Sequence, residues 1–284
     1  MATDQQVLPV STSVAPDFPP EQRSLFCDVL QHLNRARVPY VVSGAFALQQ
    51  HTGIWRNTKD LDLFLPADVV PAALHELQHK GFETEIRDPV WLAKAHRDGY
   101  FVDLITGMSN GIITVDHKWI ERGSSTEVLG VPSRVLAPEE LIASKLFVNF
   151  RERFDGADIA HIIFGTKGRI DWNHLRALIG EHWGLLLWEL VLFQYVYPAK
   201  ADYIPRAVWD DLLSRFRNEL DHPRKNAPFR GSLLDDKMFA IDVHEWGMEN
   251  LLEECREQRE PKIVPLKETS TGNTTHTDET ETEQ

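Results

Sequence analysis

Three short stretches of the chain decide its fold: Val42-Ser43-Gly44-Ala45-Phe46-Ala47-Leu48, Arg56-Asn57-Thr58-Lys59-Asp60-Leu61-Asp62-Leu63 and Phe101-Val102-Asp103-Leu104. The first predicts a β-branched strand that turns at Gly44 directly into a helix. The second alternates acidic and apolar residues, which is typical of a strand with one buried face, so Asp60 and Asp62 point to the same side. The third predicts another strand, with Asp103 between apolar neighbours.

These acidic residues suggest a metal site beside a phosphate site. Two carboxylates on one strand face repel each other, and they either share a proton or bind a cation such as Mg²⁺, which prefers oxygen ligands. If the strand of Asp103 lies next to theirs, three acids could hold two metal ions. A strand that leads through Gly44 into a helix exposes free N–H groups, which favour phosphate.

Each of these residues also has a purely structural interpretation. Asp60 and Asp62 could form the solvated face of an edge strand. Arg56, Thr58 and Lys59 could be ordinary loop residues rather than triphosphate contacts. Lys145 could lie on the solvated side of a helix. The simplest prediction for Asp155 and Asp158 is a helix cap and a first-turn acid.

The combination resembles the nucleotidyltransferase superfamily with the DNA polymerase β-like fold. Its closest resemblance is to the bacterial AbiE-type branch, through Gly44 to Leu48, Arg56 to Asp62, Ser144-Lys145 and Arg153 to Asp158. Ala45 replaces the Gly or Ser of the family, which removes a hydroxyl contact to phosphate. The resemblance implies two Mg²⁺ ions and a nucleoside triphosphate substrate. It assigns catalysis and metal binding to Asp60, Asp62 and Asp103, and nucleotide binding to Ser43, Gly44, Ala45, Arg56, Thr58, Lys59 and Lys145.

The pattern along the chain predicts an α+β fold, with a small mixed β-sheet core and flanking helices, followed by an all-helical C-terminal region. We expect a disordered leader over 1–20, the core over 21–137, the helical region over 138–257 and a disordered acidic tail over 258–284. A turn is expected at Asp98-Gly99. The pattern of apolar residues also predicts a strand over 112–115 and helices over 138–153 and 244–258.

Composition limits the possible functions. The chain has 284 residues and a formal charge of −13, which disfavours extended contact with a phosphate backbone and slightly favours a cationic acceptor. Two cysteines and the lack of a long apolar run predict a cytoplasmic protein without a membrane span.

The predicted function is transfer of a nucleoside monophosphate to a hydroxyl of tRNA, protein or a small molecule. The resemblance also allows a toxin that acts with an antitoxin. The alternative is a catalytically weak or inactive protein of the same fold that binds nucleotide or a partner protein.

Overall fold

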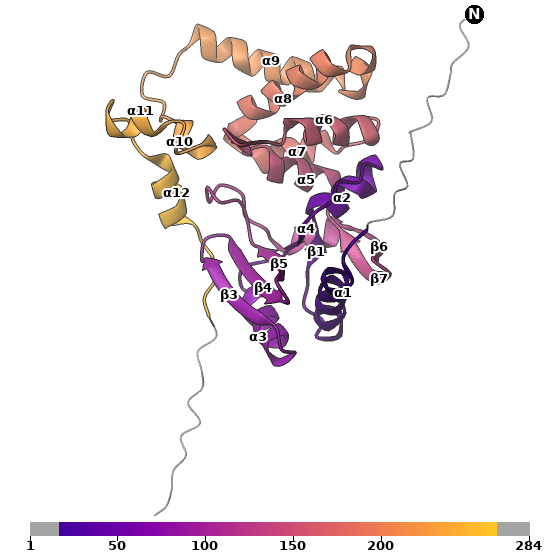
Figure 1. Ribbon diagram of the computed structural model, residues 1–284. Helices are drawn as coiled ribbons and strands as arrows, with labels where there is room; N and C mark the ends of the chain where they lie inside the picture. The colour runs from indigo at the N-terminus through magenta and orange to yellow at the C-terminus, as the bar shows by residue number, and fades with distance from the viewer. Residues whose placement is uncertain (1–16, 266–284) are drawn as a thin grey trace, which may run out of the picture.

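The computed structural model describes residues 17–265, and its centre is a seven-stranded mixed β-sheet (Figure 1). The strand order is β3-β4-β5-β2-β1-β7-β6. This arrangement confirms the predicted α+β class. The bounds are β1 Val41–Val42, β2 Asp60–Phe64, β3 Glu83–Asp88, β4 Leu92–Arg97, β5 Tyr100–Ile105, β6 Ser124–Val128 and β7 Val131–Val135. The parts of the predicted leader and tail at 1–16 and 266–284 lie outside the described residues.

Strand pairing aligns the two acidic stretches. β2 runs parallel to β5, and Asp62 lies opposite Asp103 in this register. β4 and β5 form a hairpin whose two turn residues, Asp98 and Gly99, have φ values of 53° and 80°. Two successive positive φ angles give the turn that matches the twist of the flanking strands, so the predicted turn is confirmed. This turn also places Lys94 opposite Asp103.

Helices α1 (Pro20–Arg35) and α3 (Val70–His79) pack together against the sheet. Five apolar residues of α1 recur at helical spacing and are fully buried, as predicted for one face of an amphipathic helix: Leu25, Phe26, Val29, Leu30 and Leu33. Helix α2 (Gly44–Thr52) begins directly after β1 and packs against α5 (Pro138–Lys145) and α6 (Gly156–Gly165). It therefore connects the sheet to the helical half, which lies above the sheet in Figure 1.

The C-terminal half is mainly helical, but it is not all-helical as predicted. The helix expected over 138–153 ends at Lys145, and a two-stranded hairpin follows, formed by β8 (Asn149–Phe150) and β9 (Arg153–Phe154). The hairpin returns the chain so that Asp155 reaches Lys145. The next helices after α6 are α7 Trp172–Ile179, α8 Trp183–Val196 and α9 Arg206–Asp221, with short 3₁₀ turns η1 Gly180–His182 and η2 Pro198–Tyr203.

Two other predicted elements differ from the structure. The segment 112–115 forms no strand, only a single bridge between Gly107 and Thr114. It leads into a short helix that was not predicted, α4 (His117–Arg122), whose N-terminus is capped by Asp116. The helix expected over 244–258 begins only at Leu251, as α12 (Leu251–Gln258), and His244 is instead the last residue of α11 (Ala240–His244). The positive φ of 70° at Gly247 lies in the break between them.

The chain ends its described part by returning to the sheet. We call residues 229–263 the C-terminal arm; it contains α10 (Gly231–Leu234), α11 and α12. Arg259 and Ile263 are only 4% and 3% exposed, so the prediction of a disordered tail beginning at 258 is wrong for this stretch. Likewise, Phe18 from the predicted leader packs edge-on against Phe26.

Helix α8 carries a single charged residue, Glu189, and that residue is buried. Its side chain is 2% exposed, and both carboxylate oxygens lack a hydrogen-bond partner among the described residues. Burial raises the pKa of Glu189 to about 7. An acid whose pKa is higher in the folded state than in the unfolded state lowers the free energy of unfolding as pH rises between the two values.

We therefore expect Glu189→Gln to stabilise the protein at alkaline pH. The rise in the free energy of unfolding should be about 1–3 kcal/mol at pH 8. It should be small at pH 5, where the folded wild-type protein keeps the proton. Urea unfolding at the two pH values measures this, with the exposed Glu127→Gln on β6 as the matched control. Equal effects of Glu189→Gln at both pH values would contradict the expected titration.

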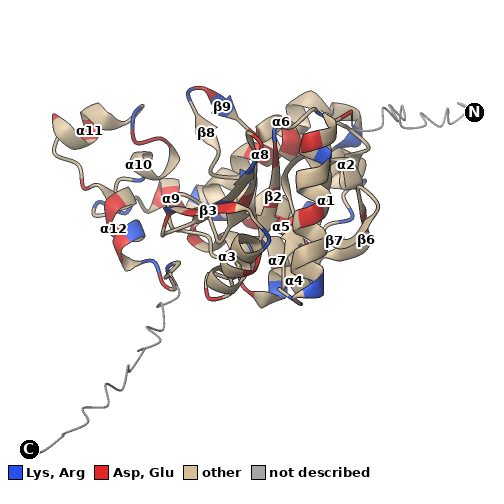
Figure 2. Ribbon diagram, turned by 60° about the horizontal axis from the view of Figure 1, so that its bottom comes forward, with Lys and Arg blue, Asp and Glu red and all other residues tan. Residues whose placement is uncertain are grey.

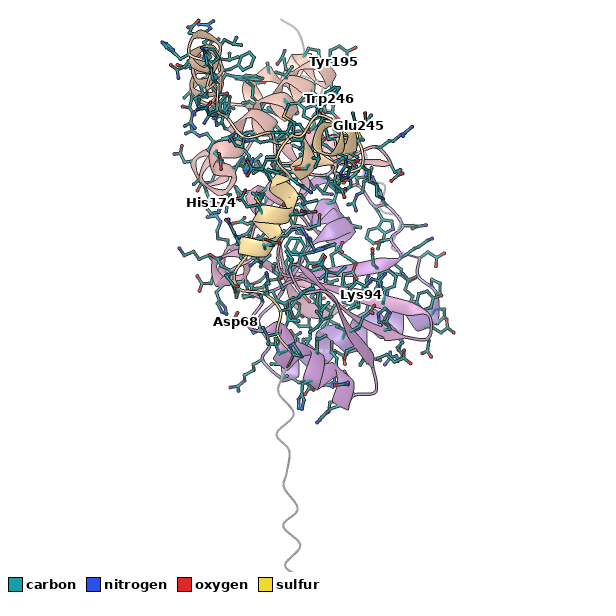
Figure 3. All side chains as sticks on the ribbon, turned by 90° about the vertical axis from the view of Figure 1, so that its left-hand side faces the viewer. Asp68, Lys94, His174, Tyr195, Glu245 and Trp246 are labelled. Atoms are coloured by element: carbon teal, nitrogen blue, oxygen red, sulfur yellow. The ribbon has the colours of Figure 1, made fainter. Side chains whose placement is uncertain are left out.

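Lys and Arg are spread among Asp and Glu over the ribbon (Figure 2). Lys94 lies in the sheet half, whereas the exposed Tyr195 and Trp246 lie at the helical end (Figure 3). Between residues 17 and 265, none of the helices combines the length and apolar character that crossing a bilayer requires.

Candidate active site

Three carboxylates meet on one face of the sheet. Asp60 and Asp62 come from β2, and Asp103 comes from the adjacent parallel strand β5. One oxygen from each of the three lies within 4.8 Å of the others. The predicted convergence of these acids, which requires strands far apart in sequence to be neighbours, is therefore confirmed as geometry. We call these residues the acidic triad.

Gly44 lies directly against the triad. Its φ is +56°, and a Cβ atom built on it would lie 1.9 Å from Oδ2 of Asp62. Only glycine allows both this backbone conformation and this close approach. The first turn of α2, with its free N–H groups, is thereby held next to the carboxylates.

Gly44→Ala is expected to disrupt the triad. The substitution should lower the free energy of unfolding by at least about 1 kcal/mol through the positive φ alone. In addition, the carboxylate of Asp62 must move away. The matched control is Gly130→Ala, because Gly130 has a φ of +84° but open space around its added Cβ. Urea unfolding and titration with Mg²⁺ measure the two effects. Equal loss of Mg²⁺ binding in both variants would refute the steric explanation.

Like charges and burial perturb the triad. Burial raises the pKa of Asp62 to about 7, with further contributions from the charges of Asp60 and Asp103. Burial also raises the pKa of Asp103, although a hydrogen bond from Lys94 opposes the shift. The Lys94 Nζ atom lies 2.5 Å from Oδ1 of Asp103, and the Thr58 hydroxyl donates to Oδ1 of Asp60 at 2.6 Å.

The donor set fits a hard divalent cation. All three groups are carboxylates, the ligand type that Mg²⁺ prefers. Oxygens on opposite sides of one Mg²⁺ ion lie about 4 Å apart, which is comparable with the separation within the triad. A bound cation would also relieve the repulsion that raises the pKa of Asp62.

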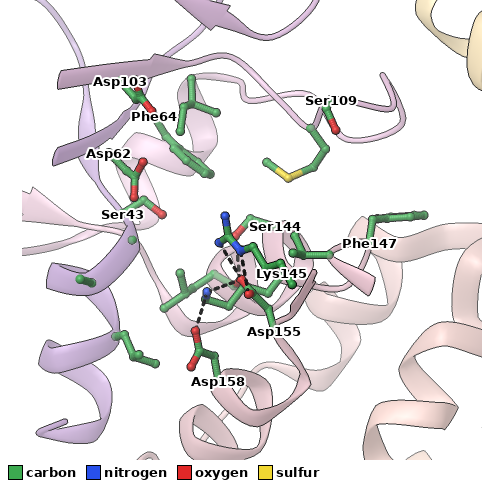
Figure 4. A pocket seen from close by; sticks show the side chains of 18 of the residues that line it. Ser43, Asp62, Phe64, Asp103, Ser109, Ser144, Lys145, Phe147, Asp155 and Asp158 are labelled. Carbon is green, nitrogen blue, oxygen red and sulfur yellow. Dashed lines mark hydrogen bonds and ion pairs between the residues drawn. The ribbon is translucent and has the colours of Figure 1, made fainter. Parts of the chain in front are cut away.

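A second charged cluster faces the triad across the pocket (Figure 4). The Lys145 Nζ atom donates to Oδ2 of Asp155 and Oδ2 of Asp158, both at 2.8 Å. Arg153 binds Asp155 through two hydrogen bonds of 3.0 Å, and Arg56 pairs with Asp158 at 2.6 Å. Lys145, Asp155 and Asp158 are each less than 9% exposed. We call these five residues the ion-pair cluster.

The ion-pair cluster changes the interpretation of its two acids. Asp155 is the N-cap residue of α6, as predicted, but its side chain makes no capping bond. Instead it binds Lys145 and Arg153. Burial would raise the pKa of Asp155, yet the hydrogen bond from Arg153 and the charge of Lys145 lower it below its ordinary value.

The triad and the ion-pair cluster line one pocket of about 420 Å³. Strand order places Gly44 after β1, Asp62 on β2 and Asp103 on β5, so these features follow one another across the sheet. A charged pocket of this size next to a helix N-terminus can accept a polyphosphate and a cation.

The sequence model of one protein family, described as nucleotidyl transferase of unknown function (DUF2204), matches residues 22–181. This match spans more than half of the chain. The chain belongs to this nucleotidyl transferase family. The matched region contains the triad, Gly44 and the ion-pair cluster, whereas the C-terminal arm lies beyond it.

Several solved structures are similar to this member of the family. One is the antibiotic-resistance factor ANT(2″)-Ia, with 17% identity, a TM-score of 0.42 and coverage of 58% of this chain and 94% of that chain. Another is an antigenic nucleotidyltransferase-like protein from Paracoccidioides brasiliensis (17%, 0.41, 67% and 96%). A third is the lincosamide antibiotic adenylyltransferase LnuA with lincomycin bound (16%, 0.36, 50% and 95%). No curated protein sequence matches the chain.

The pocket brings together most of the residues that the sequence predicted. All of the predicted catalytic and nucleotide-binding residues line it except Lys59, which is exposed and is not part of the wall. Lys59 lies at a bend directly before the first residue of β2. Ser43, rather than Ala45, supplies a hydroxyl here, and its oxygen faces the pocket in Figure 4.

Sequence reasoning missed several groups of the site. Lys94 was not singled out, although the two-residue turn at Asp98-Gly99 already places it opposite Asp103. Arg153 was noted only as part of a motif. Trp91, Met108 and Leu233 were not connected with the pocket at all, because no periodic pattern links them to the acidic strands.

Proposed function

We propose that this member of the family transfers a nucleoside monophosphate from a nucleoside triphosphate to a hydroxyl group of an acceptor, and that the transfer requires Mg²⁺. The observation that carries the proposal is the acidic triad beside the Gly44 turn, within one pocket that also contains the ion-pair cluster. In the reaction, the acceptor oxygen forms a bond to the α-phosphorus, the bond between that phosphorus and the bridging oxygen breaks, and pyrophosphate leaves.

Asp60, Asp62 and Asp103 would hold the metal ions. When bound, the ions supply neutralisation of phosphate charge and of the charge that develops in the transition state. Asp103, on the strand next to that of Asp60 and Asp62, would also be placed to accept the proton of the acceptor hydroxyl at a carboxylate oxygen. Lys94 keeps that carboxylate oriented through its 2.5 Å hydrogen bond.

The triphosphate would lie between α2 and the ion-pair cluster. The free N–H groups after Gly44, together with the Ser43 hydroxyl, can donate to phosphate oxygens. Arg56 and Arg153 border the pocket with partly exposed side chains, at 49% and 65%, so their guanidinium groups are available to leaving-group charge. Buried Lys145 is held by two aspartates, and we infer that it adds positive potential and positions Arg153 through Asp155.

The rival proposal is a protein of the same fold that binds nucleotide or a protein partner without transfer. Ala45 favoured it in the sequence, but the Ser43 hydroxyl weakens that argument. Calorimetry with the four nucleoside triphosphates, with and without Mg²⁺, followed by mass spectrometry of acceptor mixtures, distinguishes the two. Mg²⁺-dependent binding without any transferred monophosphate would favour the rival.

We expect the affinity for Mg²⁺ to increase with pH. The pKa of Asp62 is about 7 without metal, and a proton on that carboxylate competes with the cation. The thermal shift caused by 5 mM Mg²⁺ should therefore be larger at pH 8 than at pH 5.5. Asp62→Asn should remove most of this pH dependence. A thermal shift independent of pH in the wild-type protein would contradict the assignment of Asp62 as a ligand.

The proposal leaves three classes of acceptor open. tRNA, a protein and a small molecule all carry suitable hydroxyl groups, and the predicted AbiE-type branch, with a toxin role, an antitoxin partner and a cytoplasmic location, stays a prediction. A small reading frame next to the gene would support the toxin hypothesis. The formal charge of −13 gives no support to extended nucleic-acid contact.

A further inference from the structure

One end of the pocket is apolar, and it is the end farthest from Gly44 along the sheet. Beyond Asp103 on β5, the wall is formed by apolar side chains from the sheet half, the β8 hairpin region and the C-terminal arm: Trp91, Ile105, Met108, Phe147, Phe150 and Leu233. Figure 4 shows Ser109 and Phe147 at the side of the pocket away from Ser43 and Asp62. Asp62 and Asp103 lie at the opposite side of this view, and Lys145 and Asp155 lie between the two sides.

The geometry of in-line transfer indicates which end of the pocket would hold the leaving group and which would hold the acceptor. The attacking oxygen and the leaving oxygen lie on opposite sides of the phosphorus. If pyrophosphate leaves toward the Gly44 turn and the ion-pair cluster, the acceptor must approach from the side of Asp103. That side leads to the apolar end. This step depends on the proposed function.

The C-terminal arm closes the apolar end. The main-chain oxygen of Leu233 accepts a hydrogen bond of 3.1 Å from Asn110 in the loop after β5. Two residues later, Asp235 accepts a hydrogen bond of 3.0 Å from the main-chain N–H of Arg151 in the β8 hairpin. The arm thus joins the two walls of the pocket, and Leu233, which is 4% exposed, contributes the side chain between them.

Further along, the arm is fixed to the sheet. Arg256 donates to Asp88 at 2.8 Å and to the main-chain oxygen of Ser109. Arg259, buried at 4% exposure, donates to the main-chain oxygen of Thr106 at 2.8 Å. Asp88, three residues before Trp91, accepts hydrogen bonds from Arg256 and from the Trp91 indole. Apart from the triad, the described residues place no carboxylate on the wall of this end.

We infer that the acceptor carries its hydroxyl on an uncharged, largely apolar or aromatic body, and that Leu233 of the arm determines this specificity. A polycationic acceptor would need carboxylates to replace its hydration, and the apolar end offers none beyond the triad. The acidity of the whole chain, which slightly favoured a cationic acceptor, is thus not reflected in this part of the pocket. Leu233 and the rest of the arm lie outside the region that the family model matches, so this part of the apolar wall is not specified by the family pattern.

Saturation-transfer NMR on the full chain tests the inference with three hydroxyl compounds. Phenyl β-D-glucoside has an aromatic ring, methyl β-D-glucoside lacks it, and 2-deoxystreptamine carries two positive charges. Phenyl β-D-glucoside should bind at least about tenfold more tightly than either of the others, because its ring is buried. The series is measured with and without Mg²⁺ and α,β-methylene-ATP, which cannot be transferred.

Two variants test whether Leu233 of the arm causes the preference for the aromatic ring. Leu233→Glu should weaken phenyl β-D-glucoside at least about fivefold, and Leu233→Ala should weaken it by a smaller factor, while the Kd for α,β-methylene-ATP changes less than about twofold. Leu220→Glu, at an exposed site on α9, is the matched control. The inference is overturned if 2-deoxystreptamine binds as tightly as phenyl β-D-glucoside or more tightly, or if the phenyl glucoside does not bind detectably. It is also overturned if Leu233→Ala leaves the affinity for phenyl β-D-glucoside unchanged. If α,β-methylene-ATP does not bind, the proposed function is refuted instead. The comparison of the three hydroxyl compounds still shows whether the apolar end binds an aromatic ring.

Discussion

Asp62→Asn is expected to lower the rate of nucleotidyl transfer by about 10³-fold or more, while the protein remains folded. The residue lies at the centre of the triad, opposite Asp103 in the sheet and in contact distance of the Gly44 turn. Loss of metal neutralisation costs several kcal/mol of transition-state stabilisation, and each 1.36 kcal/mol corresponds to a factor of about ten.

The same substitution should not reduce the stability of the metal-free protein. The pKa of Asp62 is raised to about 7, so ionisation of this carboxylate lowers the free energy of unfolding between about pH 4 and pH 7. Asparagine removes that cost. At pH 8 and without Mg²⁺, urea unfolding should therefore show a variant at least as stable as the wild-type protein.

The exposed Asp68→Asn, in the same half of the molecule, is the matched control for both measurements (Figure 3). It should leave the rate and the stability unchanged. An Asp62→Asn protein that transfers nucleotide at more than about a tenth of the wild-type rate would reject the triad as the metal site.

Lys145→Met is expected to destabilise the fold by about 3 kcal/mol or more at neutral pH. Removal of one partner from a buried ion pair leaves an uncompensated charge, and Lys145 is shared by two buried carboxylates. Arg153 and Arg56 continue to bind Asp155 and Asp158, which limits the loss. Chemical unfolding followed by tryptophan fluorescence measures it, and the exposed Lys118→Met on α4 is the control.

The effect of Lys145→Met should shrink in acid. The pKa of Asp155 lies below its ordinary value in the folded protein, so its contribution to stability is present above the unfolded pKa and is lost as pH falls through the folded value. The double variant Lys145→Met/Asp158→Asn should lose less than the sum of the two single variants, because the residues interact directly. Additive losses that do not change between pH 7 and about pH 2.5, below the ordinary pKa of an aspartate, would show that Lys145 acts independently of its aspartates.

The local sequence pattern was sufficient to predict the part of the site that lies on strands. Alternation placed Asp60 and Asp62 on one face, and the short run before Gly44 placed the turn, because both depend on residues close in sequence. The pairing of β2 with β5 needed the resemblance to a family, since the parallel neighbours are separated by α3, β3 and β4.

The ion-pair cluster and the arm could not be predicted for a different reason. Helix propensity continued through Lys145, but the bonds from Lys145 to Asp155 and Asp158 are better satisfied when the chain turns back through a hairpin. Similarly, the polar composition after Gln258 suggested disorder, whereas Arg259 and Ile263 are buried by partners about 150 residues or more earlier in the chain. Tertiary contacts of this kind leave no periodic signal.

The two ends of the pocket are completed at different times during synthesis. Residues 43–158 supply the triad, the Gly44 turn and the ion-pair cluster, and they leave the ribosome well before Leu233 and Arg259. Domains form as their segments emerge from the N-terminal side. A nascent chain can thus form the end of the pocket that holds the triad first, and Leu233 is added to the apolar wall only when the last helices have been translated.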